Sequence, residues 1–302
     1  MTILMPHIAE RLFNEPLMVD AGKLASILCG LGGRIVDGGI ELAGIDPLHH
    51  AAFANGRPSD VMGKIGDPLR HMTSDRRIYT QVGPVAVIPV EGTLVHKGKW
   101  IGQSSGQTSY EGLQAQIERA REDDSVRAVV LEVDSAGGQV AGAFETARMM
   151  QQLSAAKPTL AILTDFALSA GYLLASQARR IVMPDTGSAG SIGVATLHAD
   201  MSQKLEKEGI RVTLIHSGAY KVEGNPVTPL ADEVRARLQA RVDATRDLFA
   251  AAVEQGRGNR LNRAAALATE AQIYQGEDAV RAGLVDGIID PQAAFRAFVK
   301  SV

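Results

Sequence analysis

The alternation of strand-like and helix-like segments from Val82 onward is the feature that most constrains the fold. Its clearest unit is Val126–Val133 (VRAVVLEV), a β-branched stretch that is followed by a Gly-rich turn and then by a helical pattern at Val140–Leu153. Strands that alternate with helices of roughly 10–15 residues are typical of βαβ units with parallel strands. The sequence therefore predicts an α/β fold with a mainly parallel sheet.

The same apolar spacing predicts the other elements of this region. Strands are expected at Val85–Val90, Thr159–Leu163, Ile181–Met183, Val212–Ile215 and Leu284–Ile289. Pro89 places the first of these at a sheet edge or near a strand end. Helices are expected at Tyr110–Glu122, Ser169–Ala178, Asp200–Glu208, Leu230–Gln255, Glu277–Ala282 and at the C-terminus, and a loop at Ser217–Pro229.

Residues 1–81 have a different character. Apolar residues recur at helical spacing over Pro6–Leu31, whereas Asp46–Arg77 is rich in Gly, Pro, His and charged residues without periodicity. We therefore expect two parts, a helical N-terminal segment with a linker at residues 1–81 and one large domain at residues 82–302.

Composition and missing motifs exclude several classes of protein. With 31 basic against 34 acidic residues and 4% aromatic residues, the chain is not expected to bind nucleic acid. The single cysteine, Cys29, excludes an intramolecular disulfide and Cys-rich metal sites. No apolar run reaches the ~18 residues of a membrane helix and no signal peptide is visible, so we expect a soluble protein without a membrane anchor. The sequence also has no P-loop, G-x-G-x-x-G, H-E-x-x-H or G-x-S-x-G motif.

Gly/Ser-rich turns follow four of the predicted strands, at the edge of an α/β sheet where sites are built. They are Asp134–Gly138, Ala167–Tyr172, Gly187–Gly193 and Ser217–Lys221. Each has two interpretations. The first turn could hold an oxyanion or could only need a positive φ. Ser169 in the second turn could be a nucleophile or a helix N-cap. The third turn could be a site or a plain connector, and Lys221 in the fourth could be functional or simply solvated.

Together, these turns resemble in order and spacing the signal peptide peptidase A family of Ser-Lys proteases. Leu168–Tyr172 is similar to the family's A-S-G-G-Y nucleophile turn, and Ser217–Lys221 to its S-G-x-Y-K base loop. Asp134–Gly138 is similar to its N-S-P-G-G oxyanion turn, with Asp and Ala in place of Asn and Pro, and Gly190–Gly193 to its G-S-I-G turn. The resemblance covers roughly Val82 to Ile289 and implies a ClpP/crotonase-like fold of ββα and βαβ units.

The resemblance also implies a mechanism without metal or cofactor. Ser169 would be the nucleophile and Lys221 the general base, which must be desolvated because a lysine amine accepts a proton only when neutral. Ser191 would orient the amine, and the backbone N–H groups of Gly137 or Gly138 and of Ala170 would hold the oxyanion. His198 with Asp200 is the alternative base, and we favour Lys221 because it lies inside a matching motif.

A narrower resemblance concerns the biology. Pro6–Ala9, Phe13–Met18, Lys221–Pro226 and Val242–Arg246 are similar to the lambda-type phage head proteases. This implies a homo-oligomer that cleaves scaffold, capsid or portal proteins within the prohead in the host cytoplasm, with Lys221 able to complete a neighbour's site. Such proteins often carry a C-terminal scaffold region; because this chain stops at Val302, we expect scaffold from another product or a truncated chain. An inactive capsid-assembly factor and a crotonase-like acyl-CoA enzyme remain as alternatives.

Overall fold

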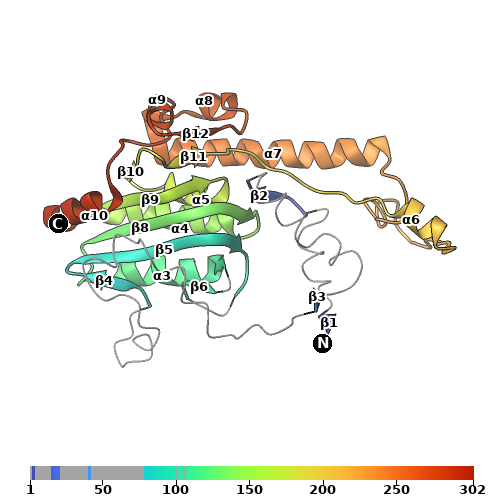
Figure 1. The fold of residues 1–302 in the computed structure, drawn as a ribbon, viewed down its shortest axis with the longest axis horizontal. Coiled ribbons are helices and arrows are strands. Elements are labelled where there is room, and N and C mark those ends of the chain that lie inside the picture. Colours follow the sequence, from blue (N-terminus) through green and yellow to red (C-terminus); the bar gives the residue numbers. More distant parts are fainter. Residues whose placement is uncertain (1, 4–14, 21–39, 42–77, 99–100, 105) are drawn as a thin grey trace.

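A computed structural model describes residues 2–3, 15–20, 40–41, 78–98, 101–104 and 106–302 (Figure 1). Three short strands belong to the N-terminal part: β1 (Thr2–Ile3), which pairs antiparallel with β3 (Ile40–Glu41), and β2 (Leu17–Val19). The helix expected at Pro6–Leu31 is wrong at β2, because the backbone of Leu17–Val19 pairs with the main sheet and its first two side chains are buried there. The rest of that expected helix, and the linker expected at Asp46–Arg77, lie outside the described residues.

The main sheet has the strand order β12–β11–β9–β8–β5–β7–β6, and β2, β4 and β10 pair with β8, β5 and β9. Its strands are β2, β4 (Thr80–Val82), β5 (Val85–Val95), β6 (Gln103–Ser104), β7 (Gln107–Ser109), β8 (Ala128–Gln139), β9 (Thr159–Leu168), β10 (Arg180–Val182), β11 (Ser188–Gly190) and β12 (Ile273–Gln275). The four central strands are parallel to one another: β5 pairs with β8, β8 with β9, and β9 with β11. The predicted α/β class with a mainly parallel sheet is confirmed.

Helices follow the strands as the alternation predicts. They are α3 (Tyr110–Glu122), α4 (Ala143–Ala156), α5 (Ala170–Ala175), α6 (Ser202–Lys207), α7 (Asp232–Arg257), the 3₁₀ helix η4 (Gly258–Arg260), α8 (Arg263–Ala268), α9 (Glu277–Arg281) and α10 (Pro291–Ser301). Ser109 is the N-cap of α3, and its hydroxyl accepts the Gly112 N–H in the first turn of the helix. Within the described ranges, no helix has the length and apolar character needed to cross a membrane.

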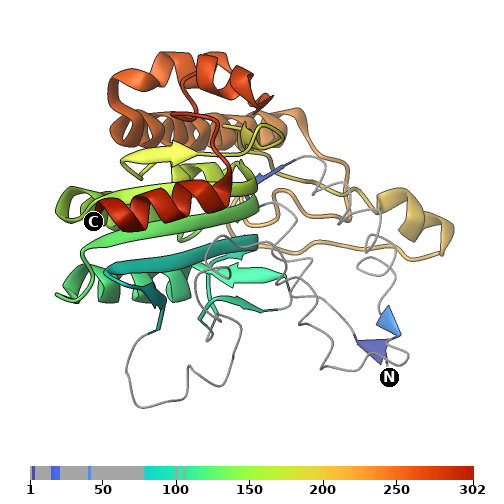
Figure 2. The same cartoon turned by 60° about the vertical axis from the view of Figure 1, so that its left-hand side comes forward.

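The two faces of the sheet are covered by different layers. Because side chains alternate along a strand, Ala86 and Ile88 of β5 pack into the larger core with α3, α4 and α5. Val85 and Val87 point to the other face, where α10 covers them with Phe295 (Figure 2). The continuous apolar runs in the sequence arise from this burial on both faces.

Several elements differ in extent from the expectation. Strand β8 continues through the Gly-rich turn to Gln139, because its end pairs with both β5 and β2. The sheet edge or strand end expected from Pro89 is wrong, because Pro89 lies inside β5, which has partners on both sides. Pro89 lies between the stretch of β5 that pairs with β4 and the stretch that pairs with β7. The strand expected at Leu284–Ile289 is wrong except for one bridge, Met183 to Ile288.

The strand expected at Val212–Ile215 is also wrong. This segment has no regular structure and is exposed, and among the described residues no strand pairs with it. It belongs to a long excursion, residues 196–231, that carries α6 and the loop at Ser217–Pro229 and reaches away from the sheet (Figure 1). We call residues 196–231 the arm. The loop was correctly predicted within it.

Candidate active site

Ser169 lies where β9 ends and α5 begins, at the carboxyl ends of the parallel strands. Its backbone has φ 52° and ψ −121°, a region that residues other than Gly rarely adopt. Two hydrogen bonds hold this turn: the Ser169 N–H donates to the Gly190 carbonyl, and its carbonyl accepts the Leu173 N–H, both at 2.9 Å. The hydroxyl does not cap α5 and instead donates to the Gly193 carbonyl at 3.4 Å. The side chain is thus directed away from the role of an ordinary N-cap.

The turn at the end of β8 lies directly against Ser169. Gly137 has φ 97°, and a Cβ at this position would lie 3.0 Å from the Cβ of Ser169 and 3.0 Å from the Ala170 nitrogen. Its own N–H donates to the Ser135 hydroxyl at 3.1 Å, and that hydroxyl donates to the Gly92 carbonyl at 2.6 Å. The structure therefore brings the predicted residues Gly137 and Ala170 together with Ser169.

The third turn stands beside the second. In the parallel pair of β11 and β9, Gly190 lies opposite Leu168, so Ser191 and Ser169 are the residues that follow the same paired position. Ser191 also has a positive φ, 55°, and its N–H donates to the Gln272 carbonyl at 2.9 Å. It is 9% exposed, and Ser169 beside it is also buried.

Lys221 is not part of this cluster within one chain. It lies in the arm, is exposed, and its backbone N–H donates to the Gly218 carbonyl at 3.2 Å. Across the described part of the chain, no hydrogen bond or ion pair is formed by its amine. The neighbouring Tyr220 ring is 72% exposed and lies 5.2 Å from the Arg237 guanidinium.

His198 and Asp200, the alternative to Lys221 as the general base, have another explanation in this structure. The Asp200 carboxylate accepts the Ser202 N–H at 2.9 Å at the start of α6. Hydrogen bonds from Ser202, with a smaller contribution from nearby His198, hold the pKa of Asp200 below its usual value. Asp200 thus acts at the beginning of a helix, which gives no support to a Ser-His-Asp arrangement.

Tyr172, in the same turn as Ser169, has a structural role. It is fully buried, and its hydroxyl donates to the Leu284 carbonyl at 3.0 Å. Burial raises the pKa of this phenol well above its ordinary value, so it stays a neutral donor. This hydrogen bond fixes α5, which begins with Ala170, to the C-terminal part of the chain.

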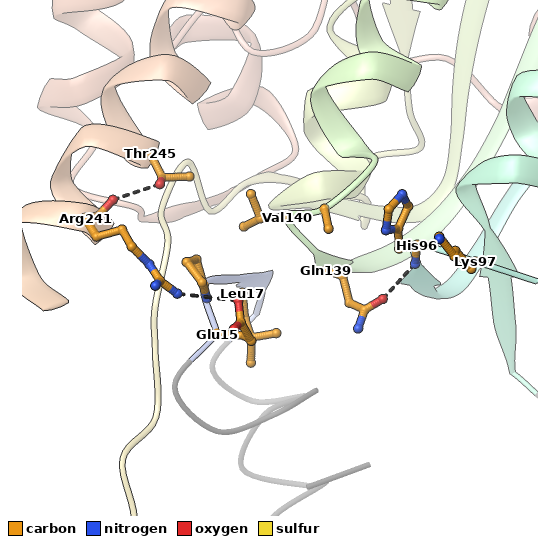
Figure 3. A pocket seen from close by; sticks show the side chains of 10 residues that line it. Glu15, Leu17, His96, Lys97, Gln139, Val140, Arg241 and Thr245 are labelled. Carbon is orange, nitrogen blue, oxygen red and sulfur yellow. Dashed lines mark hydrogen bonds and ion pairs between the residues drawn. The ribbon is translucent and has the colours of Figure 1, made fainter. Parts of the chain in front are cut away.

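Sequence reasoning missed the partner that lies over this cluster. Strand β2 pairs antiparallel with Gly137–Gln139, and Leu17 forms an isolated bridge with Ala195. The only signal in the sequence is the apolar triplet Leu17–Val19, which is too short to tell a strand from a helix. Beside β2 lies a pocket of about 530 Å³, which is shown in Figure 3.

Comparison with known proteins agrees with the sequence motifs. The model of peptidase family S49 matches residues 151–301. Capsid assembly protease C of Escherichia phage lambda is 38% identical over 95% of this chain and 63% of its own length. Head-tail preconnector protein GP5 of Enterobacteria phage P21 is 36% identical over 96% of this chain and 56% of its own length. The chain thus spans about three fifths of the length of these curated relatives.

More distant relatives and solved structures are similar over a smaller part. Putative signal peptide peptidase SppA of Enterococcus faecium is 30% identical over 68% of this chain and 59% of its own. An enoyl-CoA hydratase/isomerase family member aligns over 74% of each chain with a TM-score of 0.44 and 13% identity. A mutant of the 1510-N membrane-bound stomatin-specific protease aligns over 70% of this chain and 82% of its own, with a TM-score of 0.42 and 17% identity.

Proposed function

Because the chain belongs to peptidase family S49, we propose that it is a serine endopeptidase whose nucleophile is Ser169. The observation that carries this proposal is the strained turn of Ser169, with φ 52°, which lies against Gly137 and the Ala170 N–H. A serine whose backbone is held in a sparsely populated conformation by hydrogen bonds on both sides is typical of a positioned nucleophile.

In the proposed reaction, the Ser169 Oγ attacks the peptide carbonyl while the Lys221 Nζ takes the hydroxyl proton. The carbonyl oxygen becomes an oxyanion, for which we assign the N–H groups of Gly138 and Ala170 as donors. Gly137 gives the turn its positive φ, since its own N–H is bonded to Ser135. The amine product leaves with the proton from the lysine, and water then hydrolyses the acyl-enzyme in the same way.

We propose that Lys221 is supplied by a neighbouring copy of the chain. It is exposed in the arm, whereas a lysine that acts as a general base has to be desolvated. Insertion of the arm into a neighbour would bury the amine and bring it to that copy's Ser169 and Ser191. The exposed apolar side chains of the arm, Ile215 above all, support such a contact.

For the substrate, we propose the scaffold, capsid or portal proteins of an assembling phage head, within the prohead in the host cytoplasm. The names of the two phage relatives, a capsid assembly protease and a head-tail preconnector protein, support this class.

The deciding experiment compares the protein with its Ser169→Ala variant in the presence of phage head proteins. We expect fragments by mass spectrometry with the parent chain and none with Ser169→Ala. A matched control is Ser125→Ala, which removes an exposed hydroxyl at the opposite end of β8 and should cleave normally. Equal processing by a folded Ser169→Ala variant would refute the protease and favour a structural role in assembly.

A further inference from the structure

The segment Glu15–Asp20 lies extended across the candidate active site. On one edge, β2 pairs antiparallel with Gly137–Gln139, the end of the strand that carries the oxyanion turn. On its other edge, Leu17 exchanges two backbone hydrogen bonds with Ala195, at 2.7 and 2.9 Å. The segment is therefore held by main chain on both sides, as an added strand is held in a sheet.

Met18 is the residue of this segment whose carbonyl lies against Gly137. It is fully buried, and a Cβ on Gly137 would collide with its carbonyl oxygen. That same Cβ position is 3.0 Å from the Cβ of Ser169 and from the Ala170 nitrogen. The Met18 carbonyl thus lies beside the proposed nucleophile and oxyanion donor, where the carbonyl of a scissile peptide would have to lie.

We propose that the space between Gly137–Gln139 and Ala195 is the site at which an extended polypeptide substrate binds, and that Glu15–Asp20 fills it as a competing strand of the same chain. This inference rests on the proposed protease function. Because the segment is tethered, its effective concentration at the site is of the order of millimolar. A substrate must displace it, so release of the segment controls access to Ser169.

The pocket beside β2 adds a preference for charge. Its lining includes His96, Lys97 and Arg241, and Arg241 forms an ion pair with Glu15 at 3.4 Å (Figure 3). Glu15 lies three residues before the buried Met18. The site therefore suits an extended chain with an apolar residue at the position of Met18 and an acidic residue three positions earlier.

A reversible disulfide lock between β2 and position 195 tests whether Glu15–Asp20 occupies the proposed binding site. In a Cys29→Ser background, Leu17→Cys with Ala195→Cys places two thiols across a hydrogen-bonded antiparallel pair. Such a pair has Cα atoms about 5.5 Å apart, within the range of disulfides. The Ser169→Ala form is mixed with a labelled peptide of sequence Glu-Pro-Leu-Met-Val-Asp, and binding is followed by fluorescence anisotropy. We expect no binding to the oxidised lock and restored binding after reduction. Equal binding before and after reduction would overturn the proposal.

A second variant should open the site. Met18→Asp places a charge at a fully buried position, so we expect the segment to leave and the peptide to bind about ten-fold tighter or more than to the parent. Met18→Leu retains an apolar side chain and should keep peptide binding weak. Equal binding by these two variants, both folded by circular dichroism, would contradict the competing strand. A peptide that begins with Lys instead of Glu should bind a few-fold more weakly, and equal binding would contradict the charge preference.

Binding in the Ser169→Ala form does not depend on cleavage, so the two proposals can fail separately. If peptide binding depends on the lock but the parent protein cleaves nothing, the protease function is refuted and the proposed peptide-binding site is retained. If the parent protein cleaves its substrate and the oxidised lock still binds the peptide, the proposed peptide-binding site is refuted and the protease function is retained.

Discussion

At the scale of single residues, Gly137 is a position where a small change should have a large effect on activity. Its φ of 97° disfavours any side chain, and a Cβ would lie 3.0 Å from both Ser169 and Ala170 and collide with the Met18 carbonyl. We predict that Gly137→Ala lowers the cleavage rate by about 10²-fold or more, because the oxyanion donors are displaced. The measurement is kcat on a peptide or head-protein substrate.

Gly83→Ala is the control for Gly137→Ala. Gly83 also has a positive φ, 56°, but a Cβ there would meet nothing within 4 Å. It should lose about 1 kcal/mol of stability from backbone strain and keep its activity. If both variants cleave equally well, Gly137 does not shape the active site.

The candidate site was predictable where its chemistry depends on residue type. Four Gly/Ser turns and their resemblance to the motifs of a protease family located Gly137, Ser169 and Ser191 in the sequence, and these residues do lie together. The bond from the Gly137 N–H to Ser135 and the strand β2 could not be predicted. The first is a local bond between residues two positions apart, which residue type alone does not specify. The second is a contact between segments that are distant in sequence, which periodicity does not report.

At the scale of elements, one buried ion pair joins the end of α7 to the C-terminal region. The Arg257 side chain is 0% exposed and forms two hydrogen bonds with the Asp286 carboxylate, each at 2.9 Å. The same carboxylate accepts the Ile181 N–H at 2.7 Å, next to the sheet. Burial raises the pKa of Asp286, but the bonds and charge of Arg257 outweigh this, so the pKa lies below its ordinary value.

This ion pair predicts a pH-dependent stability. A carboxyl group whose pKa is lower in the folded state contributes stability above its unfolded pKa, about 3.9, which is lost as the pH falls through the folded value. We predict that Asp286→Asn costs about 3 kcal/mol at pH 7, because Arg257 is left buried without its partner. The free energy of unfolding in urea should then fall less between pH 7 and pH 3 than in the parent.

The exposed pair of Arg281 and Asp278 supplies the control, since these side chains are 72% and 63% exposed. Asp278→Asn should cost no more than about 1 kcal/mol. A loss as large as that of Asp286→Asn would mean that burial does not set the strength of these pairs.

The elements themselves were predictable where burial within one chain decides them. The β-branched Val126–Val133 became the central strand, and Tyr110–Glu122 became a helix with the predicted bounds. Val212–Ile215 has the same strand-like composition, yet it lies exposed in the arm. A strand needs a neighbour for its backbone bonds, and composition alone does not show whether the same chain supplies one.

At the scale of the whole molecule, the arm leaves apolar side chains exposed to solvent in a single chain. Its exposed apolar side chains are Ile210, Val212, Leu214, Ile215 and Tyr220, and Ile215 is 94% exposed. Contiguous exposed apolar surface marks an interaction site in a globular protein. Since the arm also carries Lys221, burial of this surface against a second copy would deliver the proposed base to that copy's active site.

A mixing experiment distinguishes a shared site from a site within one chain. Ser169→Ala and Lys221→Ala should each be inactive alone, and a 1:1 mixture should regain activity in about a quarter of its sites, where an intact serine meets an intact lysine from a neighbour. Ile215→Asp, introduced into both variants, places a charge in the arm's apolar surface and should abolish the regained activity. Light scattering and cross-linking of tagged copies establish that mixed oligomers form. If they form and the mixture stays inactive, the dyad lies within a single chain and the arm must fold back to reach Ser169.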